Sequence, residues 1–284
     1  MNDLASPHLI GVFDSGVGGL SVVREILRQL PQEQVIYFGD TEHVPYGCRS
    51  VIELISFADA IADYLLMQGA EIIVVACNTS ASVSLQYLRA KLAVPVVGVV
   101  EPGAFGAAAA TRNRRVGLIA TEATVKSGSY ARSLTELDPG VKLFAKACPL
   151  FVPLVEAGLA ATKQAKAIAR TYLKSLQAEE IDTLILGCTH YPFLAPVLQE
   201  ILGPGVQLVD PAQATVAQTA AILAGLPRSE ETVPAFGGGQ NVVEHSYFVS
   251  GDPELFHKVG SAFLANQLPK PRQVILSTSG KEDI

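Results

Sequence analysis

Several features are missing from the sequence, and each absence excludes a class of protein. No cluster of Lys and Arg occurs, and the net charge is −6, so nothing indicates a nucleic-acid partner. No apolar run reaches the ~20 residues of a membrane span. The most apolar region, Val94–Ala110, is interrupted by two prolines and Glu101. The first eight residues contain no Lys or Arg, and Asp14 ends the apolar run 9–13, so we expect no signal peptide. These absences favour a cytosolic protein that binds neither membranes nor nucleic acid.

Cysteine is also scarce, with four residues and no CxxC pair. In a reducing compartment a disulfide framework is not expected. The spacing of Cys188 and His190 is not typical of zinc ligands, so we predict no metal site. A lone cysteine after a buried strand is usually an inert apolar side chain, which is our interpretation of Cys48 and Cys148.

The composition and patterning predict an α/β protein. Of 284 residues, 49% are hydrophobic and 17% charged, as in a well-packed domain or two. Short apolar runs alternate with stretches of helical period, which predicts parallel sheets covered on both faces. The predicted strands are Leu9–Phe13, Val35–Phe38, Ile72–Ala76, Val94–Val99, Val116–Ala120, Val141–Ala145, Thr183–Leu186 and Val206–Val209. The predicted helices include Gly19–Leu30, Val51–Met67, Ser80–Lys91, Thr162–Leu176 and Phe193–Leu202.

The strands fall into two similar sets of four. The strand from Ile10 resembles the one from Val116, 106 residues later, and the run ending at Cys77 resembles the one ending at Cys188, 111 residues later. Such nearly equal offsets suggest a duplicated unit with one cysteine in each half. Strand patterns are degenerate, however, so parallel α/β halves can look alike without duplication; the matched cysteines favour the repeat.

The remainder of the chain contains fewer elements. An Ala-rich helix is predicted from Pro211 to Leu223, followed by a Gly- and Pro-rich loop over 227–241. A further strand at 242–250 and a final helix at 253–264 are possible interpretations. The tail from Pro269 is predicted to be poorly ordered.

Polar motifs follow four of the strands, at the edge where open parallel sheets form their sites. The motifs are Asp14-Ser15-Gly-Val-Gly-Gly, Gly39-Asp40 with Pro45-Tyr46-Gly47, Cys77-Asn78-Thr79-Ser80 and Cys188-Thr189-His190. Each cysteine precedes a predicted helix, whose N-terminal dipole and free N–H groups favour a thiolate. The glycines after Ser15 resemble a phosphate cradle but do not fit G-x-G-x-x-G, and no Walker lysine follows. His190 alone is more often structural; beside Cys188 it is favoured as a group that steers a proton or a carboxylate.

A pair of cysteines suits one reaction class in particular. Hydrolases of the serine or papain type need one nucleophile and one base. Racemisation needs a base on one face of Cα and an acid on the other, with the roles reversed for the other enantiomer. Cys77 and Cys188 meet that need if one is thiolate while the other is thiol, which couples their titrations.

Stabilisation of the substrate is predicted to come from the protein alone. No lysine at the motif ends could hold pyridoxal phosphate, so we expect no cofactor. Preorganised N–H groups and hydroxyls would stabilise the developing carbanion. Arg49 is the nearest cation, so we expect substrate carboxylates at helix N-termini and at Ser15, Thr79 and Thr189.

At these positions the sequence resembles the glutamate racemases of the aspartate/glutamate racemase superfamily, from Ile10 to about Leu264. Any one of the shared motifs would be weak, but their ordered set is highly specific. The motifs are GVFDSGVGGLSV, YFGDTEHVPYG, ACNTSAS, GVVEPGA, LVEAG, LGCTHYPFL and FVSGDPELFHKVG.

The resemblance implies cofactor-free interconversion of L- and D-glutamate, supplying D-glutamate for peptidoglycan. It assigns Cys77 to D-glutamate and Cys188 to L-glutamate, with Asp14, His190 and Glu156 as assisting groups. The substrate-binding positions it implies are Asp14, Ser15, Pro45, Tyr46, Gly47, Asn78, Thr79, Thr189 and His190.

The resemblance also implies a fold and an assembly. Two pseudo-symmetric α/β domains with mainly parallel sheets enclose the active site, and the C-terminal part returns to the first domain, commonly in a homodimer. We expect a first domain of residues 1–98 plus 211–264, a second of 99–210, and a tail of 265–284.

Three alternatives remain open. Aspartate racemases belong to the same superfamily, although His190 in GCTHYP favours glutamate. A binding protein that closes on a dicarboxylate would not require paired cysteines. A redox dithiol would require that Cys77 and Cys188 can be bridged.

Overall fold

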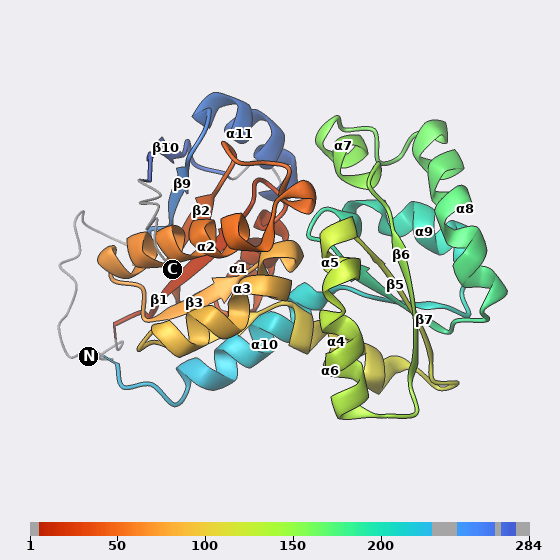
Figure 1. The fold of residues 1–284 in the computed structure, drawn as a ribbon. Helices are drawn as coiled ribbons and strands as arrows, with labels where there is room; N and C mark the ends of the chain where they lie inside the picture. The colour runs from red at the N-terminus through yellow and green to blue at the C-terminus, as the bar shows by residue number, and fades with distance from the viewer. Residues whose placement is uncertain (1–5, 229–242, 265–267, 277–284) are drawn as a thin grey trace.

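The computed structural model describes residues 6–228, 243–264 and 268–276, which form two α/β parts side by side (Figure 1). The first contains a six-stranded sheet of order β10-β9-β2-β1-β3-β4, and the second a four-stranded sheet of order β6-β5-β7-β8. Every strand pair is parallel. The predicted α/β fold with two mainly parallel sheets is therefore confirmed.

Except for β10, the strands form where the apolar runs predicted them, with small shifts at their ends. Their bounds are β1 Leu9–Asp14, β2 Gln34–Gly39, β3 Ile72–Val75, β4 Val96–Gly98, β5 Arg115–Ala120, β6 Lys142–Ala147, β7 Thr183–Gly187, β8 Gln207–Val209, β9 Ser246–Val249 and β10 Arg272–Gln273. Every residue of β3 and β7 is buried, as expected for central strands covered by helices on both faces.

Helices connect the strands and cover the sheets. They are α1 Leu20–Gln29, α2 Val51–Met67, α3 Asn78–Lys91, α4 Val100–Ala110, α5 Glu122–Ser127, α6 Ser129–Leu137, α7 Phe151–Glu156, α8 Lys163–Ala178, α9 Ala195–Leu202, α10 Pro211–Leu223 and α11 Pro253–Gly260, with 3₁₀ turns η1 Tyr46–Cys48, η2 Tyr191–Leu194 and η3 Ser261–Leu264. In the first part α2 packs against α3, and α1 packs against α10. In the described part of the chain no helix is long and apolar enough to span a membrane.

The strand orders of the two sheets correspond. The order β2-β1-β3-β4 in the first sheet matches β6-β5-β7-β8 in the second, with each strand four positions later along the chain. This is the arrangement that the predicted repeat requires, and it makes β3 the counterpart of β7. Cys77 and Cys188, which follow these two strands, therefore occupy equivalent places.

After β8 the chain returns to the first sheet. Helix α10 packs against α1 and α4, and β9 then pairs with β2, aligning Ser246 with Ile36. We propose the expected division, residues 1–98 plus 211–264 and residues 99–210, as the two domains, because each range contains one of the two sheets apart from β10.

Some sequence expectations need correction. Part of the tail predicted to be poorly ordered forms β10, which pairs with β9, so the tail does not separate from the first sheet at 265. Helix α3 begins at Asn78, two residues earlier than predicted, and the stretch from Phe193 is divided between η2 and α9. Residues 1–5, 229–242, 265–267 and 277–284 lie outside the described part, including most of the predicted loop 227–241.

Candidate active site

The motifs of the two halves meet where their strands end. Asp14 is the last residue of β1, and Thr189 follows β7 of the second half. The Thr189 hydroxyl donates a hydrogen bond of 3.1 Å to the Asp14 carboxylate. Residues 175 positions apart are thus joined at the facing edges of the two sheets.

The glycines after Ser15 allow this close approach. A Cβ atom on Gly18 would lie 2.3 Å from the Thr189 hydroxyl oxygen and 2.5 Å from His190 Nδ1. A Cβ atom on Gly19 would lie 2.4 Å from that of Asp14. Gly18 therefore allows the two halves to pack closely, and Gly19 allows close packing within the first half.

Cys77 caps the N-terminus of α3 and is buried, with its sulfur 3.8 Å from the Ser15 hydroxyl. Burial, and after it the carboxylate of Asp14, raises the pKa of Cys77 to about 12, although a hydrogen bond from the Ser80 backbone N–H opposes the shift. The prediction that the helix terminus favours a thiolate is therefore wrong for Cys77 in this structure. Loss of water around the sulfur outweighs the helix end, and Cys77 is a thiol at neutral pH.

Cys188 is also buried, but its neighbour is an imidazole. Its sulfur lies 3.8 Å from His190 Nδ1, and His190 Nε2 lies 3.1 Å from a carboxylate oxygen of Glu156. Burial disfavours the protonated imidazole, but the contacts with Cys188 and Glu156 outweigh it and raise the pKa of His190 to about 10. His190 is therefore a cation at neutral pH beside the Cys188 sulfur.

Asp14 lies between these two groups. Its side chain is fully buried and accepts a 2.9 Å hydrogen bond from the backbone N–H of Gly16 besides the one from Thr189. Burial raises the pKa of Asp14, although the charge of His190 and the two hydrogen bonds oppose the shift. The carboxyl group is positioned to influence charge on both sides of the site.

The predicted loop residues also reach the site. The Val44–Pro45 peptide bond is cis, and Tyr46 is buried in one apolar cluster with Cys77 and Phe57. A Cβ atom on Gly47 would lie 3.5 Å from Cβ of Thr121 in the second half. Pro45-Tyr46-Gly47 therefore lies between Cys77 and Thr121 of the second half.

The start of α3 is joined to the second half by side chains that we did not predict. Asn78 accepts a 2.6 Å hydrogen bond from the Tyr130 hydroxyl, and the hydroxyl of Thr79 lies 2.9 Å from that of Thr121. Thr124 lies 3.4 Å from the same oxygen of Thr79. The repeat could have indicated Thr121, since it follows β5 at the position where Ser15 follows β1.

Of the two cysteines predicted to be apolar side chains, Cys148 is buried, but Cys48 is not, and its thiol donates a 3.3 Å hydrogen bond to the Pro45 carbonyl. The buried Cys148 contacts the backbone oxygen of Lys146 at 3.6 Å. Arg49, the nearest cation in sequence, is engaged by the His43 carbonyl at 3.0 Å and by Glu53. Among the described residues no cluster of three His, Cys, Asp or Glu side chains could hold a metal ion.

Comparisons with known proteins agree with the motifs. The family described as Asp/Glu/Hydantoin racemase matches residues 10–219. A glutamate racemase of Desulforudis audaxviator is 51% identical over 263 residues, covering 92% of this chain and 95% of its own. The crystal structure of glutamate racemase from Thermus thermophilus in complex with beta-chloro-D-alanine has a TM-score of 0.82 at 43% identity, over 96% of this chain and 99% of that one. A Francisella tularensis glutamate racemase in complex with D-glutamate has a TM-score of 0.83 at 32% identity, over the same shares. The chain therefore belongs to the glutamate racemases of the Asp/Glu/Hydantoin racemase family.

Proposed function

We propose that this enzyme interconverts L- and D-glutamate without a cofactor, with Cys77 and Cys188 as the acid and base on opposite faces of Cα. The observation that carries the proposal is that the two cysteines follow corresponding strands, β3 and β7, of sheets with the same strand order. Both are buried and free, and their neighbouring motifs touch through Thr189 and Asp14.

In the proposed reaction the thiolate of one cysteine removes the Cα proton, and the electron pair stays on the substrate as a carbanion conjugated with its carboxylate. The thiol of the other cysteine then donates its proton to the opposite face. The proton count of the enzyme is unchanged, but the protonated sulfur has changed sides. Coupled titration of the pair follows from this exchange.

The supporting residues have different proposed roles on the two sides. Following the family resemblance, Cys188 acts on L-glutamate with His190 and Glu156 as its assistants, and Cys77 acts on D-glutamate with Asp14. The contacts of His190 with both Cys188 and Glu156 support the first assignment. The substrate-binding set is Ser15, Pro45, Tyr46, Gly47, Asn78, Thr79 and Thr189, with Asp14 and His190 shared between both roles.

Hydroxyls and backbone N–H groups would hold the substrate carboxylates. The engagement of Arg49 in its own loop supports this expectation, because the nearest cation is already paired. Preorganised N–H and O–H donors of this kind stabilise charge that develops during the reaction. By the same resemblance we propose a cytosolic homodimer whose D-glutamate enters peptidoglycan synthesis.

The test is incubation of the purified protein with L-glutamate in D₂O without pyridoxal phosphate. We expect D-glutamate carrying deuterium at Cα and decay of the circular-dichroism signal of L-glutamate. A dicarboxylate-binding protein or a redox dithiol would show neither deuterium exchange nor decay of the signal. That result would refute racemisation. A parallel incubation with L-aspartate separates the two substrates, since preferential exchange there would assign the aspartate reaction instead.

A further inference from the structure

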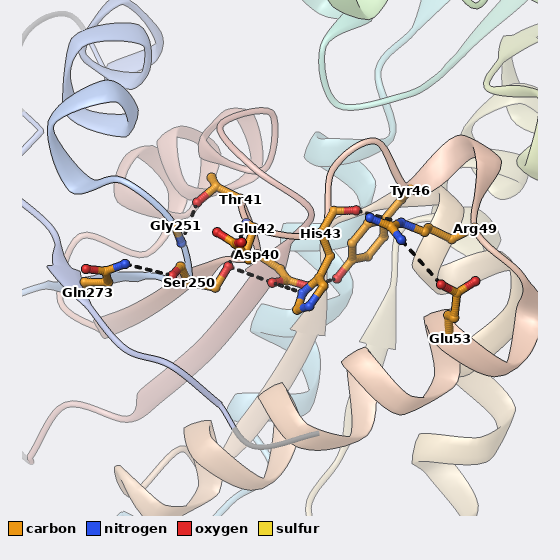
Figure 2. A network of polar contacts seen from close by, with 10 residues as sticks. All are labelled: Asp40, Thr41, Glu42, His43, Tyr46, Arg49, Glu53, Ser250, Gly251 and Gln273. Carbon is orange, nitrogen blue, oxygen red and sulfur yellow. Dashed lines mark hydrogen bonds and ion pairs between the residues drawn. The ribbon is translucent and has the colours of Figure 1, made fainter. Parts of the chain in front are cut away.

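Asp40 lies directly after β2 and is buried, yet its side chain faces the loop that contains Tyr46 (Figure 2). Its carboxylate accepts a 2.5 Å hydrogen bond from the Tyr46 hydroxyl and a 2.7 Å hydrogen bond from the Ser250 hydroxyl. Nδ1 of His43 lies 2.8 Å from one of its oxygens. One carboxylate thus gathers three groups, one of them 210 residues away in sequence.

Through Ser250, Asp40 is linked to the C-terminal segment. Ser250 follows β9, and its hydroxyl oxygen accepts a 2.9 Å hydrogen bond from the backbone N–H of Glu42. The Gln273 side chain of β10 donates to the Ser250 carbonyl at 3.2 Å. The backbone N–H of Gly251 donates to Thr41 at 3.0 Å. The loop after β2 is therefore fastened to β9 and β10 by side chains as well as by strand pairing.

Through His43 and Tyr46, Asp40 is linked to the candidate active site. The His43 ring stacks on Phe57 with centroids 4.1 Å apart, and Phe57 also packs against the Tyr46 ring. Arg49 closes the loop by donating to the His43 carbonyl. Tyr46 belongs to the same apolar cluster as Cys77, so a shift of Tyr46 would change the packing around the Cys77 sulfur.

We propose that Asp40 is a positioning residue, which holds the substrate loop 43–49 through the Tyr46 hydroxyl and takes its own position from Ser250 at the end of β9. The proposal rests on the proposed function, because it assigns a task within glutamate binding. Removing the carboxylate leaves the buried Tyr46 hydroxyl without this partner, and the loop must move to satisfy it. Asp40 acts through Tyr46 and does not itself touch the reacting atoms.

The test compares Asp40→Ala, Tyr46→Phe and the double variant in steady-state racemisation. We expect Asp40→Ala to raise KM for glutamate about tenfold, the size expected for loss of a hydrogen bond to a charged group, with a smaller change in kcat. Because both substitutions break the same contact, the double variant should be no worse than the more affected single variant. Asp40→Asn, which keeps the shape and one acceptor oxygen but replaces the other with an amide donor, should show a smaller rise in KM than Asp40→Ala, and so should Ser250→Ala.

Glu42→Gln is the matched control, because it removes a negative charge from an exposed side chain of the same loop and should leave KM unchanged. Additive effects in the double variant, or a KM within twofold of wild type for Asp40→Ala, would overturn the proposal. If Asp40→Ala does not fold, Tyr46→Phe and Ser250→Ala decide the same question, since unchanged KM in both refutes it.

A second readout keeps this proposal separate from the reaction. Amide hydrogen exchange of residues 43–49, measured without substrate, should accelerate in Asp40→Ala and not in Glu42→Gln. Unchanged exchange in Asp40→Ala would refute the positioning role even in an active racemase. Failure of the wild-type protein to exchange deuterium into glutamate would instead refute the proposed function.

Discussion

The two halves of the molecule share a strand order but surround their cysteines differently. Cys77 contacts the Ser15 hydroxyl, and burial followed by the charge of Asp14 raises its pKa to about 12. Cys188 contacts His190, a cation held at its other nitrogen by Glu156. Topology is repeated while electrostatics is not, so an acid–base pair that is symmetric in position is asymmetric in how each sulfur gains or loses its proton.

The strongest test of the comparison replaces each sulfur. We expect Cys77→Ser and Cys188→Ser each to lower kcat by about 10²–10⁴-fold, because a hydroxyl is a far weaker acid than a thiol. Polarimetry or circular dichroism with each enantiomer measures the rate, and far-ultraviolet circular dichroism monitors the fold. Cys48→Ser, at an exposed cysteine of the loop 43–49, should lower kcat far less than either of these variants. A near-normal rate in either site variant contradicts the two-thiol proposal.

A second test replaces the assistants, and we expect His190→Asn to slow racemisation by about 10²-fold. The enantiomers have equal free energy in water, so kcat/KM must fall by the same factor in both directions. The asymmetry should therefore appear in isotope effects. In His190→Asn the effect of Cα deuteration on kcat/KM should be larger from L-glutamate, whose proton Cys188 is proposed to remove, than from D-glutamate.

The matched variant on the other side is Ser15→Ala, beside Cys77, which should show the larger isotope effect from D-glutamate. Glu156→Gln, one contact further from Cys188, should follow His190→Asn with a smaller loss of rate. Equal isotope effects from both enantiomers in His190→Asn and Ser15→Ala would show that the two surroundings are not specialised.

A third prediction concerns Gly18, where the two surroundings meet. Gly18→Ala should lower the free energy of unfolding by about 1–3 kcal/mol, because its Cβ would overlap Thr189 and His190. Urea unfolding measures this change. Gly205→Ala, whose Cβ would meet no atom within 4 Å, should change the free energy by less than about 0.5 kcal/mol. Equal stability of the two variants would mean that the halves do not need this contact.

The last prediction concerns the dependence of stability on pH. The pKa of His190 is raised from 6.5 to about 10 on folding, so its stabilisation is complete below pH 6.5 and is lost as pH rises through about 10. The free energy of unfolding should therefore fall as pH rises across this window. Unfolding of wild type and His190→Asn at pH 6, 8 and 10 checks it. An equal dependence of the free energy of unfolding on pH in both proteins would contradict the positive charge assigned to His190.

The sequence predicted the elements whose signals are local. Continuous apolar runs located β1, β3, β5 and β7, because central parallel strands are buried on both faces. β10 was missed because it is a two-residue strand whose existence depends on pairing with β9, not on its own apolar pattern. The start of α3 was predicted two residues too late, because Cys77 occupies the N-cap position and Asn78 and Thr79 already lie within the helix.

The sequence predicted where the candidate site residues lie better than it predicted their ionisation and their partners. Three of the motifs meet at the strand ends, where Asp14 contacts Thr189 and Ser15 contacts Cys77, because parallel strands place their carboxyl ends at one edge. The thiolate expected at Cys77 was wrong, since burial of the sulfur depends on tertiary packing around it. The positioning role proposed for Asp40 could not be predicted from the sequence, because its partner Ser250 lies 210 residues away.

The pairing of β9 with β2 also constrains the order in which the chain can be completed. β2 leaves the ribosome early, but the strand that covers its outer edge follows about two hundred residues later. During synthesis the unpaired N–H and C=O groups of β2 form an open edge, the kind that recruits strands from other chains. The second half, residues 99–210, contains both neighbours of β5 and can assemble its sheet in that interval. A nascent chain can therefore complete the four-stranded sheet before the six-stranded one, and the open edge of β2 is the part that most needs protection from aggregation.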